Sequence, residues 1–301
     1  MTRVSVVIPT VGRASLTDAV ASALQQEHVH EVLVMVDTPG EVTVPRDDRV
    51  RTIPVGDRTG SASARQRGVE AATGDVIGLL DDDDLWLPGK VSRQLEAVPP
   101  GDGWIVGCRT IVRRTGRPDR IWPRTVIAPH EPVPDYLFQM AWPRFGDSVL
   151  QTSTLLLPRS LALEVPLDGV ADAVHDEPTW LMSVRAHHPG LPIHQLPDAL
   201  AVYRVGDGSL STTLDDDSPA YIAWGRQHLD VVAPRTRGDY YLTSAVTAAA
   251  GAGSVAGMLR AARAGFAEGR PGPGATAYAT LKIAQVAARR GGRFVRRAGR
   301  P

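Results

Sequence analysis

Four consecutive carboxylates at residues 81–84 are the group with the clearest chemistry in this sequence. They follow the apolar run "VIGLL", which is typical of a buried strand. Adjacent carboxylates repel one another, so the run indicates either a solvated acidic turn or a site for a divalent cation, whose preferred ligands are carboxylate oxygens. A calcium loop fits poorly, because its sixth position needs glycine and here holds Trp86, counted from Asp81.

The elements that must position this run alternate between strand and helix over the first hundred residues. The patterns predict strands at 3–10, 31–37, 50–55 and 75–81, with helices at 15–26 and 61–74. Such alternation predicts an α/β fold with a parallel sheet, and ligands on these sheets bind at the carboxyl ends of the strands. Three of those ends carry Pro9 and Thr10, Asp37, and the acidic run. We therefore expect a nucleotide-sized site at this rim.

Beyond residue 100 the alternation weakens. The sequence predicts strands at 103–114, 151–158 and 199–205, a helix at 176–187, and a long irregular excursion at 122–144. Ala-rich helices dominate from residue 218 onward. We expect residues 1–100 and 101–217 to form two halves of one domain and residues 218–301 to form a helical C-terminal region.

Composition narrows the classes of partner and compartment. Lys plus Arg and Asp plus Glu both number 33, so no overall charge favours nucleic acid as a partner. Cys108 is the only cysteine, which excludes an intrachain disulfide and fits a reducing compartment. The N-terminal apolar run reaches Pro9 too soon for a signal peptide, and no run has the roughly eighteen apolar residues of a membrane helix. We expect a cytoplasmic protein, or one bound peripherally at the inner face of a membrane.

The last twenty residues are the exception to the balanced charge. Residues 282–301 contain seven basic residues and no acidic one. Such a tail is either a frayed, solvated end or a segment that contacts anionic lipid or another protein.

Four motifs in register resemble the family-two glycosyltransferases, which are inverting sugar transferases of the GT-A fold. The motifs are "SVVIPTVGR", "VMVD", "TGSASARQRGVEAATGDVIGLLDDDDLWLPGK" and "HDEPTWLMSV". The resemblance implies a Rossmann-type, mostly parallel sheet flanked by helices, followed by a helical C-terminal extension. It also implies transfer of a sugar from a nucleoside-diphosphate sugar to an acceptor hydroxyl, assisted by Mg²⁺ or Mn²⁺. The acceptor would be a glycan, a lipid-linked compound or a small molecule.

The resemblance also assigns the donor site residue by residue. The last acid of the Asp-x-Asp pattern binds the metal, which here implies Asp83 together with Asp81. Asp37 would hold the base or ribose, although a carboxylate there could equally cap a turn, and Arg65 could equally be a surface arginine. Arg204 and Ser209 would approach the diphosphate or the acceptor, although this segment could equally be a plain turn. The full set of implied donor-binding residues is Pro9, Thr10, Arg13, Asp37, Arg65, Asp81, Asp82 and Arg204.

Inverting transfer needs a base for the acceptor hydroxyl, and "HDEPTWLM" supplies Asp176 and Glu177. Register with the family favours Glu177, with Asp176 as the alternative. The carboxylate that is not catalytic would complement the helix N-terminus.

Two other classes of protein share part of this pattern. A nucleotide-sugar-binding protein without chemistry would keep the acidic rim but lack a working base, and the shifted "DEPTW" pattern favours it. A Mg²⁺-dependent nucleotidyltransferase would need a Gly-rich, basic loop after the first strand, where "PTVGRAS" has one Gly and one Arg.

Overall fold

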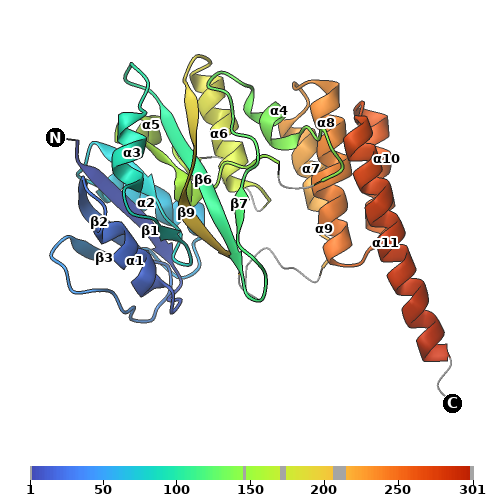
Figure 1. Cartoon of the computed structure of the whole chain (residues 1–301), viewed down its shortest axis with the longest axis horizontal. Coiled ribbons are helices and arrows are strands. Elements are labelled where there is room, and N and C mark those ends of the chain that lie inside the picture. Colours follow the sequence, from blue (N-terminus) through green and yellow to red (C-terminus); the bar gives the residue numbers. More distant parts are fainter. Residues whose placement is uncertain (1, 145–146, 170–173, 206–214, 299–301) are drawn as a thin grey trace. The chain divides into compact units, whose positions relative to one another are not determined.

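The computed structural model describes residues 2–144, 147–169, 174–205 and 215–298, which fall into two compact units (Figure 1). The first unit comprises Met1–Val133 and Ser148–Gly206, and the second comprises Pro134–Asp147 and Asp207–Pro301. The sequence placed a boundary after residue 217, whereas the structure groups residues 134–147 with the C-terminal helices.

The first unit begins with the predicted parallel strands. They are β1 (Val4–Thr10), β2 (Val29–Val36), β3 (Val50–Pro54) and β4 (Val76–Leu79), in the spatial order β3-β2-β1-β4. The crossovers contain α1 (Leu16–Leu24) and α2 (Ser61–Ala71). Every residue of β1 is buried, as expected for a strand covered on both faces. This half confirms the predicted α/β class.

The second half of the sheet is mixed. It adds β8 (Leu156–Pro158), β6 (Ile105–Arg114), β9 (Ile193–Val205) and β5 (Leu85–Trp86), in that order after β4, and β7 (Arg120–Trp122) pairs with β6. β8 lies antiparallel to both β4 and β6, whereas β6 and β9 run parallel. Because β8 follows β4 in the sheet, the chain just before β8 lies close to the carboxyl end of β4.

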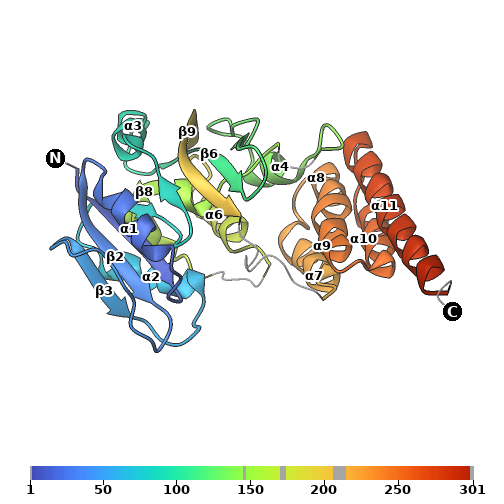
Figure 2. The ribbon, with the colours of Figure 1, turned by 60° about the horizontal axis from the view of Figure 1, so that its bottom comes forward.

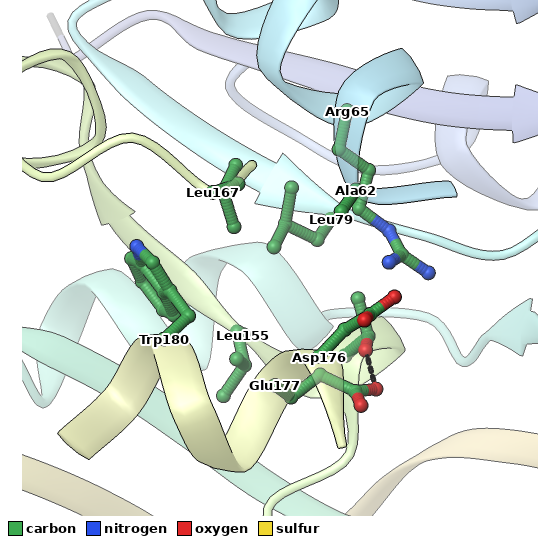
Figure 3. A pocket seen from close by; sticks show the side chains of 9 residues that line it. Ala62, Arg65, Leu79, Leu155, Leu167, Asp176, Glu177 and Trp180 are labelled. Atoms are coloured by element: carbon green, nitrogen blue, oxygen red, sulfur yellow. Dashed lines mark hydrogen bonds between the residues drawn. The ribbon is translucent and has the colours of Figure 1, made fainter. Parts of the chain in front are cut away.

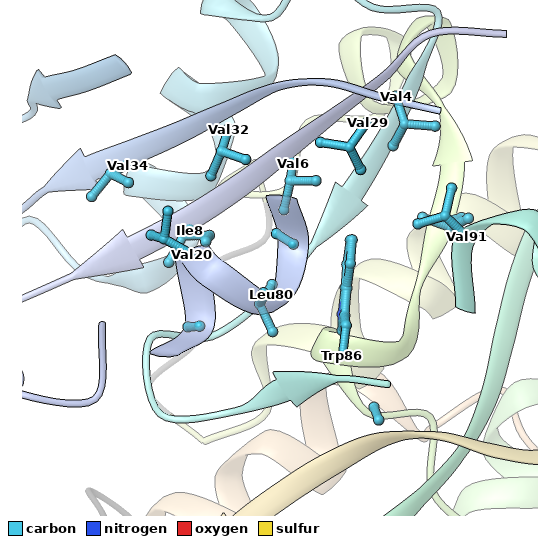
Figure 4. Packing of buried hydrophobic residues seen from close by; sticks show 14 of the residues in the cluster. Val4, Val6, Ile8, Val20, Val29, Val32, Val34, Leu80, Trp86 and Val91 are labelled. Atoms are coloured by element: carbon cyan, nitrogen blue, oxygen red, sulfur yellow. The ribbon is translucent and has the colours of Figure 1, made fainter. Parts of the chain in front are cut away.

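Alternate residues of β1 pack on opposite faces of the sheet. Val6 and Ile8 belong to a core cluster with Val20 of α1 and Val91 of α3 (Lys90–Glu96) (Figure 4). On the other face α2 approaches so closely that a Cβ at Gly68 would lie 2.3 Å from a methyl group of Val7. Only glycine fits this contact.

A second close contact fixes the chain around the acidic run. Trp86, 3 % exposed, packs against Gly78 of β4, where an added Cβ would lie 2.6 Å from the Trp86 ring. The apolar residues on either side of the run are therefore in direct contact with each other.

Three predictions for the second half of the sheet were wrong in part. Residues 151–158, predicted as one strand, form the 3₁₀ turn η1 (Thr152–Thr154) and then the short β8. β9 begins at Ile193 rather than 199 and passes through Pro197, where a register shift opposite Cys108 and Arg109 accommodates the missing N–H. The excursion at 122–144 contains α4 (Val133–Phe138). The predicted helix at 176–187 is confirmed as α6 (Asp176–His187), and α5 (Arg159–Glu164) was not predicted.

The second unit is helical, as predicted for residues 218–301, and its helices from residue 218 onward lie side by side in Figure 2. Phe138 of α4 packs edge-on against Trp224 and Tyr240, with ring centroids 5.7 and 4.9 Å away. No helix within the described ranges is both long enough and apolar enough to cross a membrane. From residue 218 onward, the elements of the second unit are α7 (Ser218–His228), α8 (Pro234–Tyr240), the π-turn η2 (Tyr241–Ala245), α9 (Val246–Gly251), α10 (Val255–Glu268) and α11 (Pro273–Ala298).

Candidate active site

The acidic run forms a tight turn at the carboxyl end of β4. The backbone N–H of Asp84 donates to the carbonyl of Asp81 at 3.2 Å, and the chain then enters β5. β4 lies directly beside β1 in the sheet, so the run is next to the carboxyl end of β1. The carboxyl ends of β1 and β4 therefore meet at one edge of the sheet, as predicted.

Asp82 ties the run to the end of β1. Its carboxylate accepts a hydrogen bond from Thr10 Oγ1 at 2.6 Å and another from Arg13 Nη1 at 2.5 Å, and Asp82 is only 2 % exposed. Burial opposes the charge of Arg13, but Asp82 and Asp83 outweigh it and raise the pKa of the guanidinium. Three residues assigned to the donor site thus share one network, and Pro9 precedes Thr10 at the buried end of β1.

Arg65 connects the acidic run to the other candidate acids. It projects from α2, is 7 % exposed, and donates from Nη2 to Asp81 Oδ1 at 2.6 Å. Burial lowers the pKa of this guanidinium, but the charges of Asp81, Glu177 and Asp176 outweigh burial and raise it. Its burial shows that the alternative of a surface arginine was wrong.

Asp84 is held by three donors. Its Oδ2 accepts from Ser153 Oγ at 2.6 Å and from Gln151 Nε2 at 2.7 Å, and its Oδ1 accepts from the backbone N–H of Arg204 at 3.1 Å. Burial, followed by the charge of Asp81, raises the pKa of Asp84 to about 8. The Arg204 side chain instead pairs with Asp18 in the first turn of α1, at 3.1 Å.

The electrostatics of the run fit a divalent cation. Within the part of the chain that the structure describes, three of its carboxylates, those of Asp81, Asp82 and Asp83, share two guanidinium groups, those of Arg13 and Arg65. Burial raises the pKa of Asp83, and the charges of Asp81 and Asp82 add to this against the opposing Arg13. A cation would relieve that excess of negative charge.

The number of protein ligands is small. Within the described ranges, no three His, Cys, Asp or Glu side chains are grouped as a metal site. Mg²⁺ in nucleotide sites is held by one or two carboxylates together with phosphate oxygens and water. Asp83, whose side chain is 34 % exposed, and Asp81, at 26 %, suit such a partial site.

Asp37 caps the turn before α2. Its Oδ1 accepts from the N–H and the hydroxyl of Thr59, both at 2.8 Å, and its Oδ2 accepts from Gly60 N at 3.0 Å. Gly60 has a φ of 98°, a conformation that favours glycine. Asp37 therefore has the capping role that the sequence analysis gave as an alternative. A contact of Asp37 with the nucleotide stays a prediction. Ser209 lies outside the described residues.

The candidate bases lie at the first turn of α6, across from α2. Glu177 Oε1 accepts a hydrogen bond from Thr152 Oγ1, and Asp176 Oδ2 accepts one from Ser61 Oγ at 3.4 Å. Figure 3 shows both acids and Arg65 around one small pocket. The other residues that line it are Ala62, Leu79, Thr152, Leu155, Leu167 and Trp180.

Sequence reasoning missed Gln151, Thr152 and Ser153, which contact these acids. Their letters, "QTS", precede "TLLL" and are typical of the start of a strand. The only available signal was four polar side chains in succession, at residues 151–154, just before a fully buried strand.

Comparison with known proteins shows the family of the chain. The model of glycosyl transferase family 2 matches residues 5–164, more than half of the 301 residues. TuaG of Bacillus subtilis (strain 168), named for teichuronic acid biosynthesis, is 24 % identical over 219 residues, which cover 69 % of this chain and 81 % of TuaG. The amylovoran biosynthesis glycosyltransferase AmsB of Erwinia amylovora is 27 % identical over 186 residues, which cover 60 % of this chain but only 58 % of AmsB.

The fold has a solved counterpart. The mannosyltransferase PcManGT from Pyrobaculum calidifontis, solved in complex with GDP-Man and Mn²⁺, superposes with a TM-score of 0.52 at 16 % identity. The superposition covers 95 % of this chain and 86 % of PcManGT, and it shows a shared GT-A fold. The sequence match and the fold agree: the chain belongs to glycosyltransferase family 2 and is a glycosyltransferase with relatives in polysaccharide biosynthesis.

Proposed function

We propose that the protein is an inverting, metal-assisted transferase that moves a sugar from a nucleoside-diphosphate sugar to a hydroxyl of a growing glycan. The observation that carries the proposal is the position of Arg65, which hydrogen-bonds Asp81 and lines one small pocket together with Glu177 and Asp176. The acidic run and the candidate base therefore belong to one site. The complex of PcManGT with GDP-Man and Mn²⁺ supports the donor class, and the names of TuaG and AmsB support a glycan acceptor.

The donor nucleotide would lie along the rim formed by β1, β2 and β4. Pro9 and Thr10 at the end of β1 would contact the base and ribose, and Asp37 could accept from a base N–H or a ribose hydroxyl. Arg13 and Asp82 would hold the ribose side of the site through the network already formed between them. Arg204 would exchange its exposed partner Asp18 for the diphosphate.

Asp83, with Asp81, is the proposed holder of Mg²⁺ or Mn²⁺. When bound, such a cation neutralises the charge that develops on the departing diphosphate. The excess of carboxylates over guanidinium groups in the run supports this role. Arg65 would keep the Asp81 carboxylate oriented through the hydrogen bond at 2.6 Å.

Glu177 is the proposed base, and Asp176 is the alternative. Thr152 donates to Oε1 of Glu177, so Oε2 is the oxygen that we assign to the proton of the acceptor hydroxyl. As that proton leaves, the acceptor oxygen bonds to the anomeric carbon and the bond from that carbon to the diphosphate oxygen breaks. A single displacement of this kind inverts the anomeric configuration.

The basic C-terminal segment supports a peripheral contact with an anionic membrane surface on the cytoplasmic side. α11 carries an exposed Leu281, 57 % accessible, and six of the seven basic residues of 282–301 follow within residues 289–300. Apolar side chains followed by clustered cations are typical of a helix that lies on a lipid surface. Such a contact would suit a lipid-linked acceptor.

The first experiment measures thermal stabilisation by UDP, GDP and dTDP with and without Mn²⁺, for the wild type, Asp83→Ala and Asp198→Ala. Asp198 is a matched control, because its side chain is 37 % exposed against 34 % for Asp83 and also pairs with an arginine. We expect one diphosphate to stabilise the wild type and Asp198→Ala only with Mn²⁺, and to lose that effect in Asp83→Ala. No Mn²⁺-dependent stabilisation of folded wild type would overturn the donor site.

The second experiment tests the reaction itself. Nuclear magnetic resonance of the released or transferred sugar should show the anomeric configuration opposite to that of the donor. Retention would overturn the single displacement. Binding with neither transfer nor donor hydrolysis would indicate a binding protein, and release of pyrophosphate from a nucleoside triphosphate and a sugar phosphate would indicate a nucleotidyltransferase.

A further inference from the structure

Residues 151–153, here called the platform, contact both halves of the proposed site. Toward the acidic run, Gln151 Nε2 and Ser153 Oγ both donate to Asp84 Oδ2, at 2.7 and 2.6 Å. The backbone N–H of Asp81 in turn donates to Ser153 Oγ at 3.1 Å. Ser153 therefore binds the first and the last residue of the run.

Toward α6, the platform contacts the candidate base directly. Thr152 Oγ1 donates to Glu177 Oε1. Thr152 and Ser153 are neighbours in the chain, so the hydrogen bonds to Glu177 and to Asp84 are separated by a single peptide unit. Both hydroxyl residues are almost fully buried, with Thr152 1 % exposed and Ser153 0 % exposed.

The platform is itself held from behind by buried side chains. Trp86 Nε1 donates to the carbonyl of Ser153 at 2.7 Å, and Gln94 Nε2 donates to the carbonyl of Thr154 at 2.8 Å. Gln94 also donates to the carbonyl of Val106 in β6 at 2.8 Å. The backbone of η1 is therefore anchored to the core, and its side chains start from fixed positions.

We infer that the platform is a positioning element that fixes the positions of the metal-binding run and the catalytic base relative to each other. Ser153 and Gln151 set the position of the run, and Thr152 sets the orientation of the Glu177 carboxylate. The inference rests on the function proposed above. It assigns different effects to the two hydroxyl residues: loss of the Ser153 hydroxyl weakens donor binding, whereas loss of the Thr152 hydroxyl slows the chemical step.

The turnover test measures release of nucleoside diphosphate from UDP-glucose, UDP-N-acetylglucosamine and GDP-mannose with Mn²⁺ and water as acceptor. Thr152→Val keeps the shape of the side chain and removes its hydroxyl. We expect kcat to fall about 10- to 100-fold with KM for the donor unchanged, as for other residues that orient a catalytic group. Thr152→Ser, which restores the hydroxyl, should recover most of the activity.

Thr110→Val is the matched control. Thr110 is also buried, and its hydroxyl donates to the backbone carbonyl of Ala201 at 3.1 Å rather than to a carboxylate. This variant loses the same kind of hydrogen bond and should keep the kcat of the wild type. In a Glu177→Gln background, Thr152→Val should cause no further loss, because residues that act as a unit are not additive.

The outcomes separate the two proposals. If Glu177→Gln is inactive and Thr152→Val has the same kcat as Thr110→Val, the positioning role of the platform is refuted, while Glu177 remains the assigned base. If Glu177→Gln keeps full activity, the assigned base is wrong, and with it the role of Thr152.

The platform is also tested without turnover. Calorimetric titration of Mn²⁺-loaded protein with UDP and GDP should show at least about tenfold weaker binding for Ser153→Ala, and no change for Thr152→Val or Thr110→Val. Equal binding by Ser153→Ala and wild type would overturn the inference even if the enzyme hydrolyses none of the donors.

Discussion

Replacing Asp37 with asparagine should lower the stability of the first unit by about 2–4 kcal/mol. The carboxylate is 4 % exposed and receives three hydrogen bonds, two on one oxygen from Thr59 and one on the other from Gly60. Asparagine has the same shape, but its NH₂ group, buried like the carboxylate oxygen it replaces, would face the N–H of Gly60 and find no acceptor there. An unsatisfied buried donor costs about 1–3 kcal/mol, and loss of the charge weakens the remaining bonds further.

The assay is urea unfolding at pH 7, with Asp18→Asn as control. Asp18 is also hydrogen-bonded, to Arg204, but its side chain is 62 % exposed, so its removal should cost less than about 0.5 kcal/mol. We expect the urea midpoint of Asp37→Asn to fall by roughly 1 M or more. Equal midpoints for Asp37→Asn and the wild type would refute the capping role.

The pH dependence provides an independent check. Burial alone would raise the pKa of Asp37, but the hydrogen bonds from Thr59 and Gly60 outweigh it and lower the pKa. A carboxyl whose pKa is lower in the folded protein contributes its full stability above its unfolded pKa of about 4 and loses it as the pH falls through the folded pKa. The stability difference between wild type and Asp37→Asn should therefore be the same at pH 7 and pH 5 and shrink at pH 3.

Three further predictions concern other parts of the chain. Gly68→Ala would bring a methyl group to 2.3 Å from Val7 and should destabilise the first unit by about 1–3 kcal/mol in urea unfolding; an unchanged midpoint would mean that α2 can move away. Arg65→Met would leave the Asp81 carboxylate without its cation and should cost about 3 kcal/mol in the same assay, whereas Arg65→Lys should cost less; equal losses would show that charge is irrelevant there. Replacing the seven basic residues of 282–301 with glutamine should reduce sedimentation of the full chain with vesicles containing phosphatidylglycerol and leave sedimentation with neutral vesicles unchanged; equal sedimentation would contradict the membrane contact.

The elements of the first eighty residues were predictable because each of them is specified locally. The strands are runs of β-branched residues long enough to be recognised, and their parallel order follows from the helices between them. Once the order is known, the meeting of Thr10 and Asp82 at one rim follows from strand geometry. Their hydrogen bond confirms that reasoning.

The platform could not be predicted, because its conformation is set by distant residues. Thr152–Thr154 has the composition of a strand, yet Trp86 and Gln94 bind its carbonyls in place of a neighbouring strand. The predicted range of β9 was too short for a related reason. Pro197 is typical of a strand boundary, but the pairing of β9 with β6 continues on both sides of it. In both places tertiary hydrogen bonds outweigh local preference.

The contact between Trp86 and Gly78 restricts the length of the acidic run. The seven residues between these two positions are the whole of the chain that leaves β4, forms the turn and returns through β5. An insertion or a deletion among them would move Trp86 off Gly78 and would also withdraw its indole N–H from Ser153. Substitution can therefore change the chemistry of the run, but its number of residues is set by the packing beneath it. Variants of this enzyme should tolerate changes of side chain at the donor rim far better than any change in the length of the turn that carries it.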